Sequence, residues 1–233
     1  MAAGPAEAPA SAPPPRPLKP GRRLGLLLLL FAGVLGPLWL FAELADEVHG
    51  LEEIVFDDAL LHWFNALAGP RLDSFFLVVT RIGYEYGVVP LAVLLPLVLL
   101  VRRHRREAVF AAVACGGSAL LNMAAKHTFQ RPRPALWESL APESTFSFPS
   151  GHAMGSMTLA AVLVLLAWRT RWRWPVLAAA VAFVGLVGIS RLYLGVHYPS
   201  DVLAGWAAGL AWVAGSYLVL FRIRRPWRAG TGG

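Results

Sequence analysis

The chain has 233 residues, of which 57% are hydrophobic and 15% charged, and its mean hydropathy is +0.56. This composition is typical of a membrane protein. The net charge of +7 does not indicate nucleic-acid binding, because the basic residues stand in short clusters beside apolar runs. The one cysteine, Cys115, lies inside an apolar run, which excludes a disulfide framework, and the histidines lack zinc-site spacing, so we expect neither a metal nor another cofactor.

The first part of the chain joins a polar tail to an apolar run. Residues 1–20 are rich in Pro and Ala and lack the side chains of a core, which predicts a disordered cytoplasmic tail. Residues 24–42 carry no charge and follow a pair of arginines, as in a membrane-spanning helix. A cleaved signal peptide is the alternative. The length of the run and its Gly-Pro step favour a retained anchor.

Residues 43–83 carry most of the acidic residues. Large apolar residues within this segment recur at helical spacing opposite polar ones, which predicts an amphipathic helix lying on the membrane surface. A packed helix outside the membrane fits the same pattern. The polar side, which we expect to be solvated, is formed by Asp57, Asp58, His62 and Asn65.

Five more apolar runs without charged residues follow, at about residues 86–101, 108–125, 153–168, 174–189 and 202–221. The start of the second span is open, because residues 72–80 are apolar too. Charged side chains are costly in lipid, so we expect them only at the ends of spans. The predicted fold class is all-α, a polytopic membrane protein with a six-transmembrane-helix bundle over residues 21–225 and a short cytoplasmic tail over 226–233.

Basic residues alternate between the two ends of the predicted spans. Fifteen of the 21 Lys and Arg residues lie before the first run, in every second loop and after the last run. The positive-inside rule places these segments in the cytoplasm. Both termini are then cytoplasmic, and residues 43–83, 126–152 and 190–201 lie on the extracytoplasmic side of a cell membrane.

The segment after the third run concentrates cations on that outer side. Lys126 ends the run, and Arg131-Pro132-Arg133-Pro134 follows it. The two prolines hold the backbone extended, which would aim the cations at a common anion. Simple anchoring of basic residues at the interface is the alternative.

The fourth run opens with Pro149-Ser150-Gly151-His152. Ser150 suits a helix N-cap, and Gly151 lets a ligand approach the backbone, so the free N–H groups of the first turn can bind an anion. His152 would lie at the edge of that anion site. An ordinary helix cap beside a histidine would give the same residues.

Residues 190–201 place Arg191, His197 and Asp201 between the last two apolar runs. The planar guanidinium of Arg191 suits oxyanions. Pro199 fits the first turn of a helix, so Asp201 can point back toward His197. A carboxylate bonded to one ring nitrogen fixes the tautomer and leaves the other nitrogen as a nucleophile or base. A loop with scattered polar residues is the alternative.

The predicted topology brings these three segments to one face of the membrane. Together they resemble the three-part motif of the type 2 phosphatidic acid phosphatase superfamily of membrane phosphatases, and every motif position is filled in order. The resemblance covers about residues 125–222. Its motifs are Lys126-x6-Arg133-Pro134, Pro149-Ser150-Gly151-His152 and Ser190-Arg191-x5-His197-x3-Asp201.

The resemblance implies hydrolysis of a phosphate ester or anhydride without metal, through a phosphohistidine intermediate. It makes His197 the nucleophile, Asp201 the partner that holds its tautomer, and His152 the general acid and base. Phosphate binding would fall to Lys126, Arg133, Ser150, Gly151 and Arg191, with Arg131 as an auxiliary contact.

The expected partner is a phosphorylated lipid in the bilayer, either a polyprenyl diphosphate, phosphatidic acid or phosphatidylglycerophosphate, and the oligomeric state is not predicted. A lipid phosphotransferase using the same intermediate is one alternative. A vanadium-dependent haloperoxidase has a similar pocket, but the six spans argue against it. A lipid-binding or transport protein without activity is a further alternative, against which the intact motifs count.

Overall fold

The computed structural model describes residues 20–51 and 54–223, and within them the chain is helical, with no strand. The predicted tails, 1–20 and 226–233, lie outside the described residues apart from Pro20. The α-helices are α1 (Pro20–Leu30), α2 (Gly36–His49), α3 (Val55–Ala66), α4 (Pro70–Thr80), α5 (Val89–Val101), α6 (Arg105–Phe129), α7 (Gly151–Ala167), α8 (Arg173–Tyr193) and α9 (Pro199–Tyr217). Short π-helical segments are η1 (Phe31–Leu35), η2 (Arg81–Val88) and η3 (Leu218–Ile223).

The π-helical segments join α-helices end to end. α1, η1 and α2 form one rod, and α4, η2 and α5 form another, Pro70–Val101, of 32 residues. Residues 72–80 are therefore the first turns of the second long helix and not a separate interfacial piece. This answers the question that the sequence left open about where that helix begins.

Five helices of the described chain are long and apolar enough to cross a membrane, and they range from 21 to 32 residues. The remaining expected span, the fourth in chain order, is α7, which is apolar but has only 17 residues, at the short end of about 17–25 for a spanning helix. The protein is thus an all-α polytopic membrane protein. The count of six spans stays a prediction.

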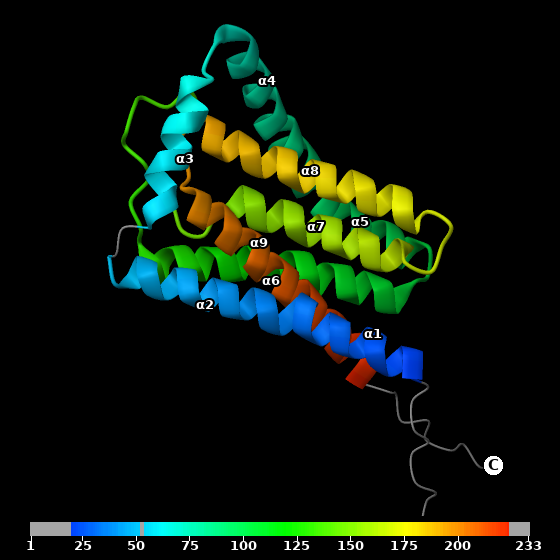
Figure 1. The fold of residues 1–233 in the computed structure, drawn as a ribbon. Helices are drawn as coiled ribbons and strands as arrows, with labels where there is room; N and C mark the ends of the chain where they lie inside the picture. Colours follow the sequence, from blue (N-terminus) through cyan, green and yellow to red (C-terminus); the bar gives the residue numbers. More distant parts are fainter. Residues whose placement is uncertain (1–19, 52–53, 224–233) are drawn as a thin grey trace, which may run out of the picture.

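Helix α7 lies inside the bundle and contacts α6, α8 and α9 (Figure 1). Its packing on α9 is unusually close. A Cβ on Gly205 would lie 2.7 Å from the backbone oxygen of Ser150, and one on Gly209 would lie 2.8 Å from that of Met154. Small residues that let two backbones meet are a common basis of helix association in membranes. The first turn of α7 is therefore held directly against α9.

One end of the bundle gathers the three motif segments. The C-terminal ends of α6 and α8 and the N-terminal ends of α7 and α9 meet there, under the loop of residues 130–150 and beside α3 (Figure 1). The arginine-rich connections α5–α6 and α7–α8 lie at the opposite end.

Helix α3 departs from the predicted amphipathic arrangement. Its apolar residues Phe56, Leu60 and Trp63 are exposed, whereas Asp57 is only 3% exposed and packs toward the bundle. The expectation that Asp57 lies on a solvated face was wrong. The helix contacts α8 and α9, so its inner side meets the ends of helices that carry polar motif residues.

Candidate active site

His197 lies in the short connection between α8 and α9 and is fully buried. Its Nδ1 is 3.4 Å from Oδ2 of Asp201, and its Nε2 is 3.1 Å from Nη1 of Arg133. A guanidinium only donates hydrogen bonds, so Nε2 must accept, and the ring proton then resides on Nδ1 beside Asp201. The lone pair of the ring is therefore on Nε2, the nitrogen expected to act as a nucleophile or base when a carboxylate lies beside the other one.

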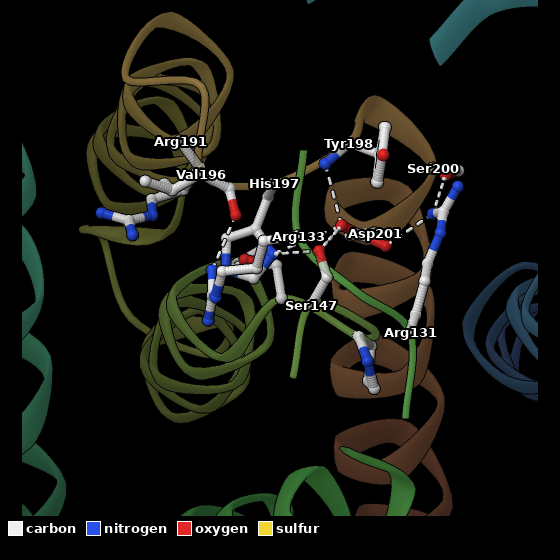
Figure 2. A network of polar contacts seen from close by, with 12 residues as sticks. Arg131, Arg133, Ser147, Arg191, Val196, His197, Tyr198, Ser200 and Asp201 are labelled. Carbon is white, nitrogen blue, oxygen red and sulfur yellow. Dashed lines mark hydrogen bonds and ion pairs between the residues drawn. The ribbon is translucent and has the colours of Figure 1, made fainter. Parts of the chain in front are cut away.

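Asp201 lies in the first turn of α9 and is held from several directions (Figure 2). Its Oδ2 accepts hydrogen bonds from the backbone N of Tyr198, at 2.8 Å, and from the hydroxyl of Ser147. Its Oδ1 accepts from Nη1 of Arg131 at 2.7 Å. These bonds fix the carboxylate against the Nδ1 side of His197.

Glu143, from the loop of residues 130–150, projects its carboxylate into the middle of the motif residues. One oxygen accepts from Nη2 of Arg191 and lies 3.8 Å from Nδ1 of His152. The other accepts from Nη2 of Arg133 at 2.5 Å and lies 4.0 Å from Nε2 of His197. Both histidines and both arginines therefore surround one anion-sized space.

Arg133 and Lys126 donate hydrogen bonds to oxygen atoms of the neighbouring loops. Arg133 donates to the carbonyl oxygens of Val196, at 2.6 Å, and of Thr145, at 2.7 Å. The Lys126 ammonium donates to the hydroxyl of Thr145, at 3.3 Å, and to the carbonyl oxygen of Phe146. Lys126 at the end of α6 and Arg133 in the segment after it therefore bind the same two loop residues, Thr145 and Phe146.

The start of α7 borders the anion-sized space through His152. Ser150 is the N-cap of α7, and its hydroxyl accepts from the N–H of Ala153 at 3.5 Å. Its backbone N donates to the backbone oxygen of Asp201 at 3.0 Å, which ties α7 to α9. The imidazole of His152 stacks on Tyr84 with ring centroids 4.2 Å apart. A Cβ on Gly151 would lie 3.1 Å from Oδ1 of Asn122, so this glycine is closely packed.

Arg131 lies apart from this anion-sized space. Its Nη1 donates to Asp201 and its Nη2 to Asp57, at 2.7 and 2.9 Å. The guanidinium also stacks on the ring of Tyr198, at 4.0 Å from the ring centroid. Unlike Arg133, Arg191 and the two histidines, Arg131 is not among the residues that contact Glu143.

Burial and neighbouring charges set the protonation states of His197 and Glu143, which both lie in loops. Burial lowers the pKa of His197 well below its ordinary value, and the charges of Arg133 and Arg191 lower that pKa further. Burial alone would raise the pKa of Glu143, but the surrounding cations, Arg191 above all, outweigh it, and the pKa of Glu143 is lowered. At neutral pH His197 is therefore neutral and Glu143 ionised.

Sequence reasoning missed three of these polar residues, Asp57, Glu143 and Ser147. Glu143 and Ser147 lie in an irregular loop, where no helical or strand periodicity marks a buried side chain. The available signal was weak. Glu143 is one of two acidic residues in the outer segment that carries Lys126, Arg131 and Arg133, and such a carboxylate among cations is a candidate partner.

The positive charge of the pocket comes from Lys126, Arg133 and Arg191. In residues 20–51 and 54–223, no group of three or more His, Cys, Asp or Glu side chains is arranged to hold a metal ion. Fixed cations of this kind can neutralise the charge of a bound oxyanion.

Comparisons with known proteins agree with this geometry. The family model of the PAP2 superfamily matches residues 107–225. Phosphatidylglycerophosphatase B of Bacillus subtilis is 31% identical over 175 residues, which cover 73% of this chain and 86% of that protein. Undecaprenyl-diphosphatase of Sulfolobus acidocaldarius is 29% identical over 172 residues, which cover 72% of this chain and 79% of that protein.

Two solved structures share the fold. The PAP2-type phosphatidylglycerolphosphate phosphatase of B. subtilis superposes with a TM-score of 0.70 at 27% identity, covering 81% of this chain and 98% of that one. LpxE of Aquifex aeolicus gives a TM-score of 0.59 at 27% identity, covering 70% of this chain and 96% of that one.

The helical bundle, the cationic pocket and these similarities define a polytopic membrane phosphatase of the lipid-phosphate class. The chain belongs to the PAP2 superfamily, as the sequence motifs indicated.

Proposed function

We propose that this phosphatase hydrolyses the phosphate monoester or diphosphate of a membrane lipid through a phosphohistidine at His197, on the extracytoplasmic face. The observation that carries the proposal is the position of the Glu143 carboxylate. This anion lies within 4.0 Å of a ring nitrogen of both His152 and His197 and is bound by two arginines. A phosphoryl group in its place would meet a nucleophile, a proton donor and fixed cations together.

In the first step, Nε2 of His197 attacks phosphorus, and the bond from phosphorus to the leaving oxygen breaks. His152, which must carry a proton in the substrate complex, donates it to that oxygen, so the leaving group departs as an alcohol or a phosphate. The imidazole becomes positively charged when the N–P bond forms. The buried Asp201 carboxylate, 3.4 Å from Nδ1, stabilises that charge and keeps the ring oriented.

In the second step, water attacks the phosphohistidine. His152, now neutral, takes a proton from the water, the N–P bond breaks, and inorganic phosphate leaves with His197 restored. Lys126, Arg133 and Arg191 hold the equatorial oxygens in both steps. Arg191 has a further donor for this purpose, because its buried Nε finds no acceptor within the described residues.

An apolar cavity supports a lipid as the substrate. The cavity of about 670 Å³ lies between α2, α6 and α9 and reaches Pro149 and Met154 at the start of α7. Its other lining residues are almost all apolar, as a hydrocarbon chain requires. The names of the relatives point to phosphatidylglycerophosphate and undecaprenyl diphosphate as substrates of those proteins, and we extend the class, not the particular lipid, to this chain.

The charge asymmetry of the bundle supports an extracytoplasmic site. The arginine-rich connections lie at the end opposite the motif residues, and such loops are normally cytoplasmic (Figure 1).

The proposal is tested by release of inorganic phosphate from a panel of lipid phosphates and diphosphates in detergent. We expect the wild type to release phosphate from at least one of these lipids and His197→Ala to lose nearly all turnover. The matched control is His127→Ala, an exposed histidine on α6 at the same end of the bundle, which should keep full activity. Phosphate release by folded His197→Ala at the wild-type rate would remove His197 as nucleophile, and transfer of phosphate to another lipid without release would indicate a phosphotransferase.

A further inference from the structure

A buried carboxylate outside the matched family region touches the site from α3. Asp57 is 3% exposed, whereas the adjacent Asp58 is exposed. A buried carboxylate is costly unless it is paired and hydrogen-bonded.

Asp57 binds Ser200, which precedes Asp201 in the chain, and Arg131, which also bonds Asp201. Its Oδ1 accepts from the backbone N of Ser200 at 2.8 Å, and its Oδ2 accepts from the Ser200 hydroxyl at 2.5 Å. Oδ2 also forms an ion pair with Nη2 of Arg131 at 2.9 Å. Through its other nitrogen, Nη1, Arg131 bonds Oδ1 of Asp201 at 2.7 Å (Figure 2).

The result is a chain of contacts from Asp57 on α3 through Arg131 and Asp201 to the imidazole of His197. One guanidinium is shared by two carboxylates, so Arg131 does not neutralise Asp201 alone. Asp201 thereby keeps negative charge to stabilise the positive ring of a phosphorylated histidine. Asp57 also fixes the geometry, because a planar guanidinium held at both ends has one orientation.

We propose that Asp57 is a positioning residue for hydrolysis, acting through Arg131 on Asp201 and so on His197. This inference rests on the proposed function. It predicts that loss of the Asp57 charge slows the chemical step while leaving substrate binding intact, because Asp57 lies on the far side of Asp201 from the anion-sized space.

The test compares Asp57→Asn with the matched control Asp58→Asn in the full-length detergent-solubilised protein. Outer groups that orient a working histidine in metal sites contribute about 10- to 100-fold, and we expect a loss of this order in kcat for Asp57→Asn, with KM within about twofold of the wild type. Asp57→Glu, which keeps the charge, should recover part of kcat. Asp58→Asn should match the wild type in both constants.

A double-substitution cycle separates this role from simple support of the fold. If Asp57 acts through Arg131, the variant Asp57→Asn/Arg131→Gln should be no slower than Arg131→Gln alone. The double variant removes both members of the Asp57–Arg131 ion pair, so it remains informative if Asp57→Asn does not fold. Losses that multiply in the double variant, or a kcat for Asp57→Asn equal to that of Asp58→Asn, would overturn the inference.

The two proposals fail differently. If the wild type and Asp58→Asn release phosphate from a lipid and Asp57→Asn does so equally well, only the role of Asp57 is lost. If neither the wild type nor Asp58→Asn acts on any lipid phosphate or diphosphate, the proposed function is lost and Asp57 has no reaction to support.

Discussion

His197 combines two properties that a free histidine in water lacks. It is neutral because burial and the neighbouring guanidinium groups oppose a charge on the ring, and its unprotonated nitrogen is Nε2 because Arg133 donates a hydrogen bond there. A neutral ring with a fixed tautomer is ready to attack phosphorus without first losing a proton. In the proposed mechanism, the arginine that binds phosphate would also set the tautomer and the charge of the nucleophile.

Replacing Arg133 should change both the rate and its pH dependence. We expect Arg133→Gln to lower kcat by about 10²–10³, the usual effect of losing one donor to a developing anion. The arginine charge lowers the pKa of His197, so its removal raises that pKa. Because the neutral ring is the active form, the acid limb of kcat/KM should move to higher pH. The measurement is phosphate release against pH.

The control for this change is Arg102→Gln, an exposed arginine at the opposite end of the bundle. It should leave both the rate and the acid limb where they are. An acid limb for Arg133→Gln that stays in place or moves to lower pH would contradict the assigned coupling between the two side chains.

The sequence identified side chains whose types are chemically specific. Lysine, arginine and histidine at fixed spacing on predicted helix ends indicated an anion site, and the structure brings Arg133, Arg191, His152 and His197 around one carboxylate. The sequence alone did not reveal the role of Asp57, because its contact with Ser200 joins residues that are 143 positions apart in the chain. Periodicity reports which face of a helix is apolar and is silent about a carboxylate buried by a distant ion pair.

At the scale of elements, the loop between α6 and α7 places its own anion in the pocket. Glu143 is ionised and bound by two arginines that the proposed reaction needs for phosphate. Substrate must displace this carboxylate, so the loop competes with every anionic ligand of the site.

Removing the Glu143 charge should therefore tighten anion binding. We expect orthovanadate to inhibit Glu143→Gln about tenfold more strongly than the wild type, equivalent to about 1.4 kcal/mol. The inhibition constant for phosphate release measures this. Glu138→Gln, an exposed glutamate of the same loop, should bind vanadate as the wild type does, and weaker inhibition of Glu143→Gln would show that the carboxylate is not a competitor.

The contact between α7 and α9 sets the position of the first turn of α7. Gly205→Ala would force a methyl group to within 2.7 Å of the Ser150 backbone oxygen, so one helix must move. Overpacking of this kind costs about 1–3 kcal/mol, and we expect a lower thermal midpoint in detergent and lower activity. Gly215→Ala lies on the same helix, where an added Cβ would meet no atom of another segment within 4 Å, and it is the control for the thermal midpoint. Equal midpoints for the two variants would argue against a tight α7–α9 contact.

At the scale of the whole molecule, hydropathy and the distribution of arginines predicted the helical membrane fold. They did not give the correct start of the second long helix. The second long helix begins at Pro70, earlier than its uncharged core indicated, because Arg71, Asp73, Arg81 and Glu85 lie within the same rod. Charged residues at a helix end interrupt a hydropathy run without ending the helix.

The proposed orientation is testable by labelling with a membrane-impermeant thiol reagent in a Cys115→Ser background. We expect Leu140→Cys, exposed in the α6–α7 loop, to be labelled in intact cells. Arg171→Cys, between α7 and α8, should react only after permeabilisation. The opposite pattern would place the site in the cytoplasm.

The central claim is a covalent bond between His197 and phosphorus. Rapid quenching of the enzyme during turnover of a lipid phosphate, followed by mass spectrometry of its peptides, should detect one phosphoryl group on His197. The adduct should be acid-labile and absent from His197→Ala. Steady turnover by the wild type with no phosphoryl group on His197, or with one on another residue, would contradict the account.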